Sequence, residues 1–172
     1  MAEGLLRHRL GQRSVPVEVS STGLVAAGRR APTEARSVAR TFGVDIDAHR
    51  SRVLEAAQLE RADLIITMEQ AHVREIAVFA PDCFDRTFAL RELIRRGEDV
   101  GPRKDGDTVV AWLDRVAVGR RPADVLGAGT ADDVADPYGR SVGAYRRAAS
   151  EIDGLLARLV DLLWPPSHEV SS

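Results

Sequence analysis

Asp63-Leu64-Ile65-Ile66-Thr67-Met68 is the stretch that decides the fold of this 172-residue chain. It is a short, continuous apolar run with β-branched residues, which is typical of a strand covered on both faces of a parallel sheet. Apolar residues with helical spacing follow over residues 69–79, and Pro81 ends that helix. A buried strand that runs directly into a helix predicts a β-α-β unit, and therefore an α/β fold.

The same alternation extends outward from this strand in both directions. Further strands are expected over residues 15–20, 44–46 and 86–90, and further helices over 1–10, 33–42, 91–96, 107–118 and 141–163. Thr33 is the expected N-cap of the second helix, and Gly43 the expected stop. We predict one three-layer α/β domain over residues 1–164, in which helices flank a short parallel sheet, followed by a polar tail over residues 165–172.

Composition excludes several classes of function. The chain has 24 Lys and Arg against 26 Asp and Glu, and no basic run stands out, so binding to nucleic acid or an anionic membrane is not expected. No apolar run approaches the roughly 20 residues that span a bilayer, and the N-terminus lacks a secretory pattern, so we expect a cytoplasmic protein. Arginine stands almost everywhere in place of lysine, which is typical of a GC-rich bacterial coding sequence. Nothing in the sequence sets the oligomeric state.

Metal and disulfide chemistry are not indicated. Cys83 is the only cysteine, which excludes an intramolecular disulfide and a cysteine zinc site. The spacing of His8, His72 and His168 is not that of metal ligands.

Asp136-Pro137-Tyr138-Gly139, just before the long C-terminal helix, is the segment most suggestive of chemistry. Alone it is a common turn signal, but Pro137 also biases Asp136 toward an extended backbone, which suits an acid held on a loop. The segment resembles the acid loop of the low-molecular-weight protein tyrosine phosphatases. Four other segments resemble that family in the same order: Met1–Leu6, Ser20-Ser21-Thr22-Gly23, His49-Arg50-Ser51-Arg52 and Asp63–Glu69. The resemblance covers nearly the whole chain.

The resemblance implies hydrolysis of phosphotyrosine through a cysteinyl-phosphate intermediate, without metal or cofactor. Asp136 would be the general acid, and Tyr138 would line the substrate cleft. Ser21, with Ser20 as the second choice, and His49 would support the catalytic loop. The alternatives are that the serine is a plain turn residue and that His49 is a partly exposed residue at a helix start. The substrate would be a phosphotyrosine protein or a small aryl phosphate, provided that a full-length form exists.

The family's nucleophile is not among the 172 residues. In the family, the helix that Met1–Leu6 resembles follows a C-x5-R loop and a central strand. Cys83 cannot begin such a loop because position 89 is Ala89, so we expect Cys83 to be a packing or surface residue. We therefore expect the chain as given to be inactive, with strand edges whose buried unpaired groups would cost ~1–3 kcal/mol each.

Two hypotheses account for this pattern. In the first, Met1 is the methionine of the family's Ser-Pro-Met-Ala-Glu run, and the true protein starts upstream and is an active phosphatase. In the second, the chain is a truncated pseudophosphatase with a binding or regulatory role. Arsenate reduction on the same fold ranks lower, because it needs further cysteines and the chain has only Cys83.

Overall fold

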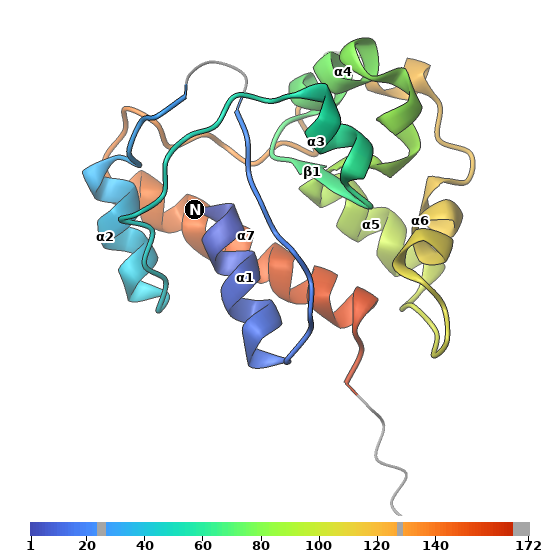
Figure 1. Cartoon of the computed structure of the whole chain (residues 1–172), viewed down its shortest axis with the longest axis horizontal. Helices are drawn as coiled ribbons and strands as arrows, with labels where there is room; N and C mark the ends of the chain where they lie inside the picture. The colour runs from blue at the N-terminus through green and yellow to red at the C-terminus, as the bar shows by residue number, and fades with distance from the viewer. Residues whose placement is uncertain (24–26, 127–128, 167–172) are drawn as a thin grey trace, which may run out of the picture. The chain divides into compact units, whose positions relative to one another are not determined.

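The computed structural model describes residues 1–23, 27–126 and 129–166 (Figure 1). Its elements in chain order are α1 (Ala2–Gln12), α2 (Thr33–Thr41), α3 (Ala56–Arg61), β1 (Ile65–Thr67), α4 (Gln70–Phe79), the 3-10 helix η1 (Pro81–Arg86), β2 (Thr87–Ala89), α5 (Leu90–Val100), α6 (Val109–Ala117), the 3-10 helix η2 (Pro122–Val125) and α7 (Val142–Leu163). The chain divides into two compact units, Met1–Glu60 with Val134–Leu156 and Arg61–Asp133 with Ala157–Ser172. The prediction of one domain over residues 1–164 stays a prediction, and residues 167–172 of the expected tail lie outside the described residues.

The second unit contains the predicted β-α-β arrangement. Strands β1 and β2 are parallel, with Ile65 opposite Thr87, Ile66 opposite Phe88 and Thr67 opposite Ala89. Helix α4 and η1 form the connection between them. The α/β class and the two strands expected around residues 63–68 and 86–90 are confirmed, although each strand is shorter than predicted.

The core of this unit surrounds the connection. Its buried members are Val73, Phe84, Ala89 and Val125, with Ala77 packed against them. Helix α5 follows β2 without a loop, and Gly97 on α5 allows close packing, since a Cβ there would lie 2.9 Å from Cζ2 of Trp112. The Trp112 indole is fully buried and donates its Nε1–H to the Gly101 carbonyl at 2.9 Å, which satisfies its one polar group.

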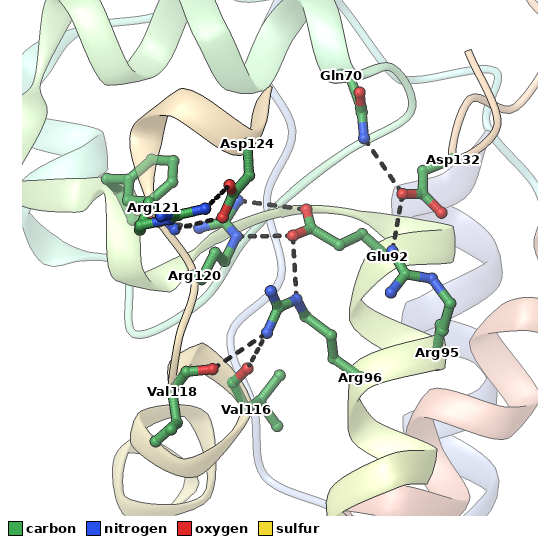
Figure 2. Close-up of polar contacts among 11 residues, drawn as sticks. Gln70, Glu92, Arg95, Arg96, Val116, Val118, Arg120, Arg121, Asp124 and Asp132 are labelled. Atoms are coloured by element: carbon green, nitrogen blue, oxygen red, sulfur yellow. Dashed lines mark hydrogen bonds and ion pairs between the residues drawn. The ribbon is translucent and has the colours of Figure 1, made fainter. Parts of the chain in front are cut away.

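A buried ion pair connects α5 to the segment after α6 (Figure 2). Arg120 donates from Nε to Glu92 Oε1 at 2.7 Å and from Nη2 to Glu92 Oε2 at 3.3 Å. Its Nη1 donates to the Phe84 carbonyl at 2.6 Å, and its guanidinium carbon lies 4.1 Å and 4.4 Å from the ring centroids of Phe84 and Phe88. The charge is therefore compensated by an anion, a carbonyl and two aromatic faces.

The first unit contains α1, α2, nearly all of α3 and the first part of α7. Gly4 lets α1 approach the loop after α2, since a Cβ there would lie 2.6 Å from Cγ1 of Val44. Arg9 on α1 binds Asp153 on α7 through two bonds, Nε–Oδ1 at 2.8 Å and Nη2–Oδ2 at 2.6 Å. This fork-to-fork geometry is the stronger form of the arginine–carboxylate pair.

Two predicted strands in this unit are wrong. Residues 15–20 and 44–46 form no strand, because neither segment pairs with another strand among the described residues. Val44 and Ile46 are instead buried loop residues. A short apolar run thus satisfied the local requirement for a strand without the hydrogen-bonded partner that a strand also needs.

The expected helix cap at Thr33 is also corrected. The N-cap is Pro32, and Thr33 is the first residue inside α2. Its hydroxyl accepts from Arg36 Nη2 at 3.2 Å. The position differs from the expectation by one residue because Pro32 has the non-helical backbone of a cap.

In the part of the chain that the structure describes, no helix is both long and apolar enough to cross a membrane.

Candidate functional site

The Asp136 loop is a tight turn whose first residue uses its own side chain to close it. Oδ1 of Asp136 accepts a hydrogen bond from the Tyr138 backbone N–H at 2.9 Å. The Arg140 N–H donates to the Pro137 carbonyl at 2.9 Å, and Gly139 has a φ of +70°. An aspartate bonded to the backbone two residues later is an Asx turn, and the positive φ favours glycine.

The side chains of this turn are open to solvent. Asp136 is exposed, and Tyr138 is 68% exposed. Val134, two residues before Asp136, is buried and fixes the start of the turn. The structure thus brings Asp136 and Tyr138 together on a defined turn, where a carboxyl group and an aromatic ring can both meet a ligand.

Tyr145 on α7 supports the turn from within the first unit. Its side chain is 5% exposed. Burial raises the pKa of the Tyr145 phenol, and the negative charges of Glu34 and Asp136 raise that pKa further, while a hydrogen bond with the Gly139 backbone lowers it. The Tyr145 phenol therefore lies within electrostatic range of the Asp136 carboxylate and in contact with the same turn. Sequence analysis did not single out Tyr145, although this residue lies only nine positions after Asp136.

The residues just before the turn are anchored within the second unit (Figure 2). Oδ1 of Asp133 accepts from the Gln70 backbone N–H at 2.7 Å, at the first residue of α4. Oδ2 of Asp132 accepts from Gln70 Nε2 at 3.2 Å and from Arg95 Nη2 at 3.0 Å. Carboxylates are favourable at a helix N-terminus because they meet unpaired N–H groups.

Ser21 and His49, the two predicted supporting residues, meet at Glu3. The Ser21 hydroxyl donates to Glu3 Oε2, and His49 Nδ1 lies 3.6 Å from the same oxygen. Arg7 Nη2 lies 2.9 Å from Glu3 Oε1. The Glu3 side chain is only 10% exposed, so it forms the centre of a half-buried polar cluster.

Glu3 is the member of this cluster that sequence analysis missed. The available signal was the spacing of Glu3 and Arg7, which are four residues apart on one helix. No hydrogen bond or ion pair among the described residues joins the Glu3 cluster to the Asp136 turn. The structure thus assembles the four predicted site residues as two separate pairs.

Of the two expected roles for Cys83, packing or surface residue, the structure shows the packing role. Its side chain is 2% exposed within η1. Arg86 Nη2 donates to its Sγ at 3.3 Å, and the Thr87 hydroxyl donates to its carbonyl at 2.7 Å. Among the described residues, no group of three or more His, Cys, Asp or Glu side chains is arranged to hold a metal ion.

Residues 1–101 match the family model for low molecular weight phosphotyrosine protein phosphatase. The chain belongs to this family. The matched residues include Glu3, Ser21 and His49, whereas Asp136 lies beyond them. Membership of the family is therefore shown, and the role of Asp136 stays a prediction.

Individual phosphatases resemble the chain over most of its length. A protein-arginine-phosphatase of Geobacillus stearothermophilus is 28% identical over 148 residues, which cover 86% of this chain and 77% of that protein. A "probable low molecular weight protein-tyrosine-phosphatase" of Ralstonia solanacearum is 34% identical over 125 residues, covering 72% and 81%. The crystal structure of a low molecular weight protein tyrosine phosphatase from T. tengcongensis matches 94% of this chain and 88% of that one, with a TM-score of 0.68 and 27% identity.

Proposed function

We propose that this chain is part of a phosphomonoesterase that acts on phosphotyrosine, with Asp136 as general acid and Tyr138 as a wall of the substrate cleft. The observation that carries the proposal is the Asx turn, which holds an exposed carboxylate two residues from an exposed aromatic ring. Family membership supplies the reaction class.

The turn suits proton transfer to a leaving group. The Tyr138 N–H occupies Oδ1 of Asp136, and no hydrogen bond to Oδ2 is found among the described residues. A protonated Oδ2 can therefore donate to the phenolic oxygen as its bond to phosphorus breaks. The resulting carboxylate can then accept a proton from the water that releases the phosphate. A positioned general acid typically contributes about 10²–10⁴-fold in rate.

The Glu3 cluster is proposed to support the catalytic loop of the family. Glu3 fixes Ser21 and His49 through one carboxylate oxygen, and Arg7 compensates the charge of that carboxylate. Such a shell keeps polar side chains in one orientation before substrate binds. These residues would act through the loop and not touch substrate.

Residues 1–172 alone are proposed to be inactive, because they contain no C-x5-R segment and their single thiol is buried. The direct test is turnover of 4-nitrophenyl phosphate by the 172-residue chain and by a protein extended through the translated upstream DNA. The proposal expects turnover only from the extended protein. A stop codon directly upstream, with a cooperatively melting inactive chain, would favour the pseudophosphatase. Turnover by the 172-residue chain would contradict both.

Phosphoarginine is a second candidate substrate. The relative from Geobacillus stearothermophilus that aligns with 86% of this chain is named a protein-arginine-phosphatase. A guanidine leaving group also departs more easily once protonated, so Asp136 could serve either reaction. Rates of phosphate release from phosphotyrosine and phosphoarginine by the extended protein decide between the two, and the larger kcat/KM identifies the substrate.

A further inference from the structure

Two loop segments of the first unit are joined by backbone hydrogen bonds beside the Glu3 cluster. The Gly28 N–H donates to the Ser51 carbonyl at 2.8 Å, and the Ser51 N–H donates to the Arg29 carbonyl at 2.9 Å. Ser51 Oγ also accepts from the Arg29 N–H at 3.0 Å. The second segment begins immediately after His49, which contacts Glu3. The geometry of the two loops is thus fixed next to a predicted site residue.

This pairing places like charges opposite one another. Arg30 and Arg50 form an antiparallel bridge, and directly opposed residues share one face. Arg52 follows two residues after Arg50, and its side chain is exposed. We refer to Arg30, Arg50 and Arg52 as the arginine cluster. Like charges directly opposite each other destabilise a strand pair.

No acidic side chain neutralises the arginine cluster within the described residues. Arg30 and Arg52 are exposed, and neither guanidinium has an ion pair there. Arg50 Nη1 donates to the carbonyls of Asp47 and His49 at 3.0 Å and 2.8 Å, which leaves its charge in place. The nearby Asp47 carboxylate is already paired with Arg36 and Arg40.

We propose that the arginine cluster binds acidic side chains that flank the phosphorylated residue of a protein substrate. The claim that this acidic ligand is a substrate rests on the proposed function. Carboxylates would relieve the repulsion between Arg30 and Arg50, and arginine favours them because its planar fork can bind both oxygens. Nucleic acid is disfavoured, since the chain carries a net charge of −2 and the cluster is small.

The test measures binding without turnover. A fluorescein-labelled Glu-rich peptide without phosphate is titrated with the 172-residue chain at low ionic strength, and a Gln-rich peptide of equal length is the control ligand. The double variant Arg30→Glu, Arg52→Glu is expected to weaken binding of the Glu-rich peptide about tenfold, because two exposed attractive charge pairs become repulsive. Added salt should weaken wild-type binding as well.

The matched control variant is Arg146→Glu with Arg147→Glu, which changes the net charge equally on exposed positions of α7. It should alter the affinity less than about twofold, because screening weakens charges away from the binding surface. An equal loss in both double variants, or wild-type binding no tighter to the Glu-rich than to the Gln-rich peptide, overturns the proposal. Failure of the phosphatase assay alone does not affect this result.

A second readout separates binding from folding. Arg30→Glu creates an opposite-charge pair with Arg50, so the melting temperature should hold or rise while peptide affinity falls. Arg52→Gln removes one charge from an exposed side chain and should weaken binding about threefold. Unchanged affinity in Arg52→Gln contradicts the proposal even if the double variant fails to fold.

Discussion

Asp136 and Glu92 are carboxylates held by hydrogen bonds in opposite surroundings. Asp136 is exposed, and one backbone N–H holds one of its oxygens. Glu92 is 5% exposed, and Arg120 bonds both of its oxygens while Arg96 Nε lies 3.4 Å from Oε1 (Figure 2). Both oxygens of the buried carboxylate are bonded to arginine, whereas no hydrogen bond to Oδ2 of the exposed one is found among the described residues. Partner number and burial therefore separate a group that stabilises the fold from a group suited to catalysis.

Breaking the buried pair should have the largest effect on stability. Glu92→Ala leaves the Arg120 guanidinium buried without its anion, and loss of one partner of such a pair costs about 3–5 kcal/mol. Urea denaturation measures this change in the free energy of unfolding. The matched control is Glu98→Ala, which removes a solvent-exposed pair with Arg158 and should cost less than about 1 kcal/mol. Equal losses in the two variants would contradict the distinction.

Removing both partners should cost less than removing one. Glu92→Met with Arg120→Met replaces two buried charges by apolar side chains, and such replacements are often neutral or stabilising by about 1–4 kcal/mol. The double variant should therefore be more stable than Glu92→Ala in the same urea titration. If the losses simply add, the pair is not coupled as its geometry indicates.

Changing the backbone of the acid turn should have an intermediate effect. Gly139→Ala places a Cβ where φ is +70° and no neighbouring atom lies within 4 Å, so the expected penalty is conformational and about 1–2 kcal/mol. The phosphatase rate of the extended protein should fall, because the turn positions Asp136. Gly11→Ala, in α1 with equally open surroundings, is the control and should stabilise by about 0.5–1 kcal/mol. A stabilising Gly139→Ala would argue against the turn.

Removing the phenol below the turn should have the smallest effect. Tyr145→Phe deletes one hydroxyl, which contributes about 1 kcal/mol. Because the folded-state pKa of Tyr145 is raised, its stabilising contribution is present below the ordinary tyrosine pKa and is lost as pH rises through the folded pKa. Spectrophotometric titration of wild type should show a phenol ionising late, and Tyr145→Phe should lack it. A late phenol that persists in Tyr145→Phe would contradict this assignment.

Sequence patterns predicted the individual helices and strands better than they predicted which strands pair. The β1–α4–β2 unit was correctly expected because its apolar spacing and its proline stop lie within neighbouring residues. Residues 15–20 satisfied the same local criteria but form no strand, since pairing depends on residues far along the chain. Periodicity in one segment carries no information about its distant partner.

The sequence predicted which residues form the candidate site, but not which contacts join them. Asp136 and Tyr138 are close in sequence, so their shared turn follows from Asp-Pro-Tyr-Gly itself. Glu3 brings together Ser21 and His49, which are 28 positions apart in sequence. Only the folded chain shows that one carboxylate serves both, and the same holds for the burial of Arg120 between two phenylalanine rings.

The central claim is that Asp136 donates the proton to the leaving group, and leaving-group dependence tests it most directly. In the protein extended upstream with a C-x5-R segment, wild type and Asp136→Asn are compared on phenyl phosphate and on 4-nitrophenyl phosphate. The variant should be slower by about 10²–10⁴-fold on phenyl phosphate, whose poor leaving group needs the proton, and much less impaired on 4-nitrophenyl phosphate. An equal loss on both substrates, or an unchanged rate on phenyl phosphate, would contradict the claim.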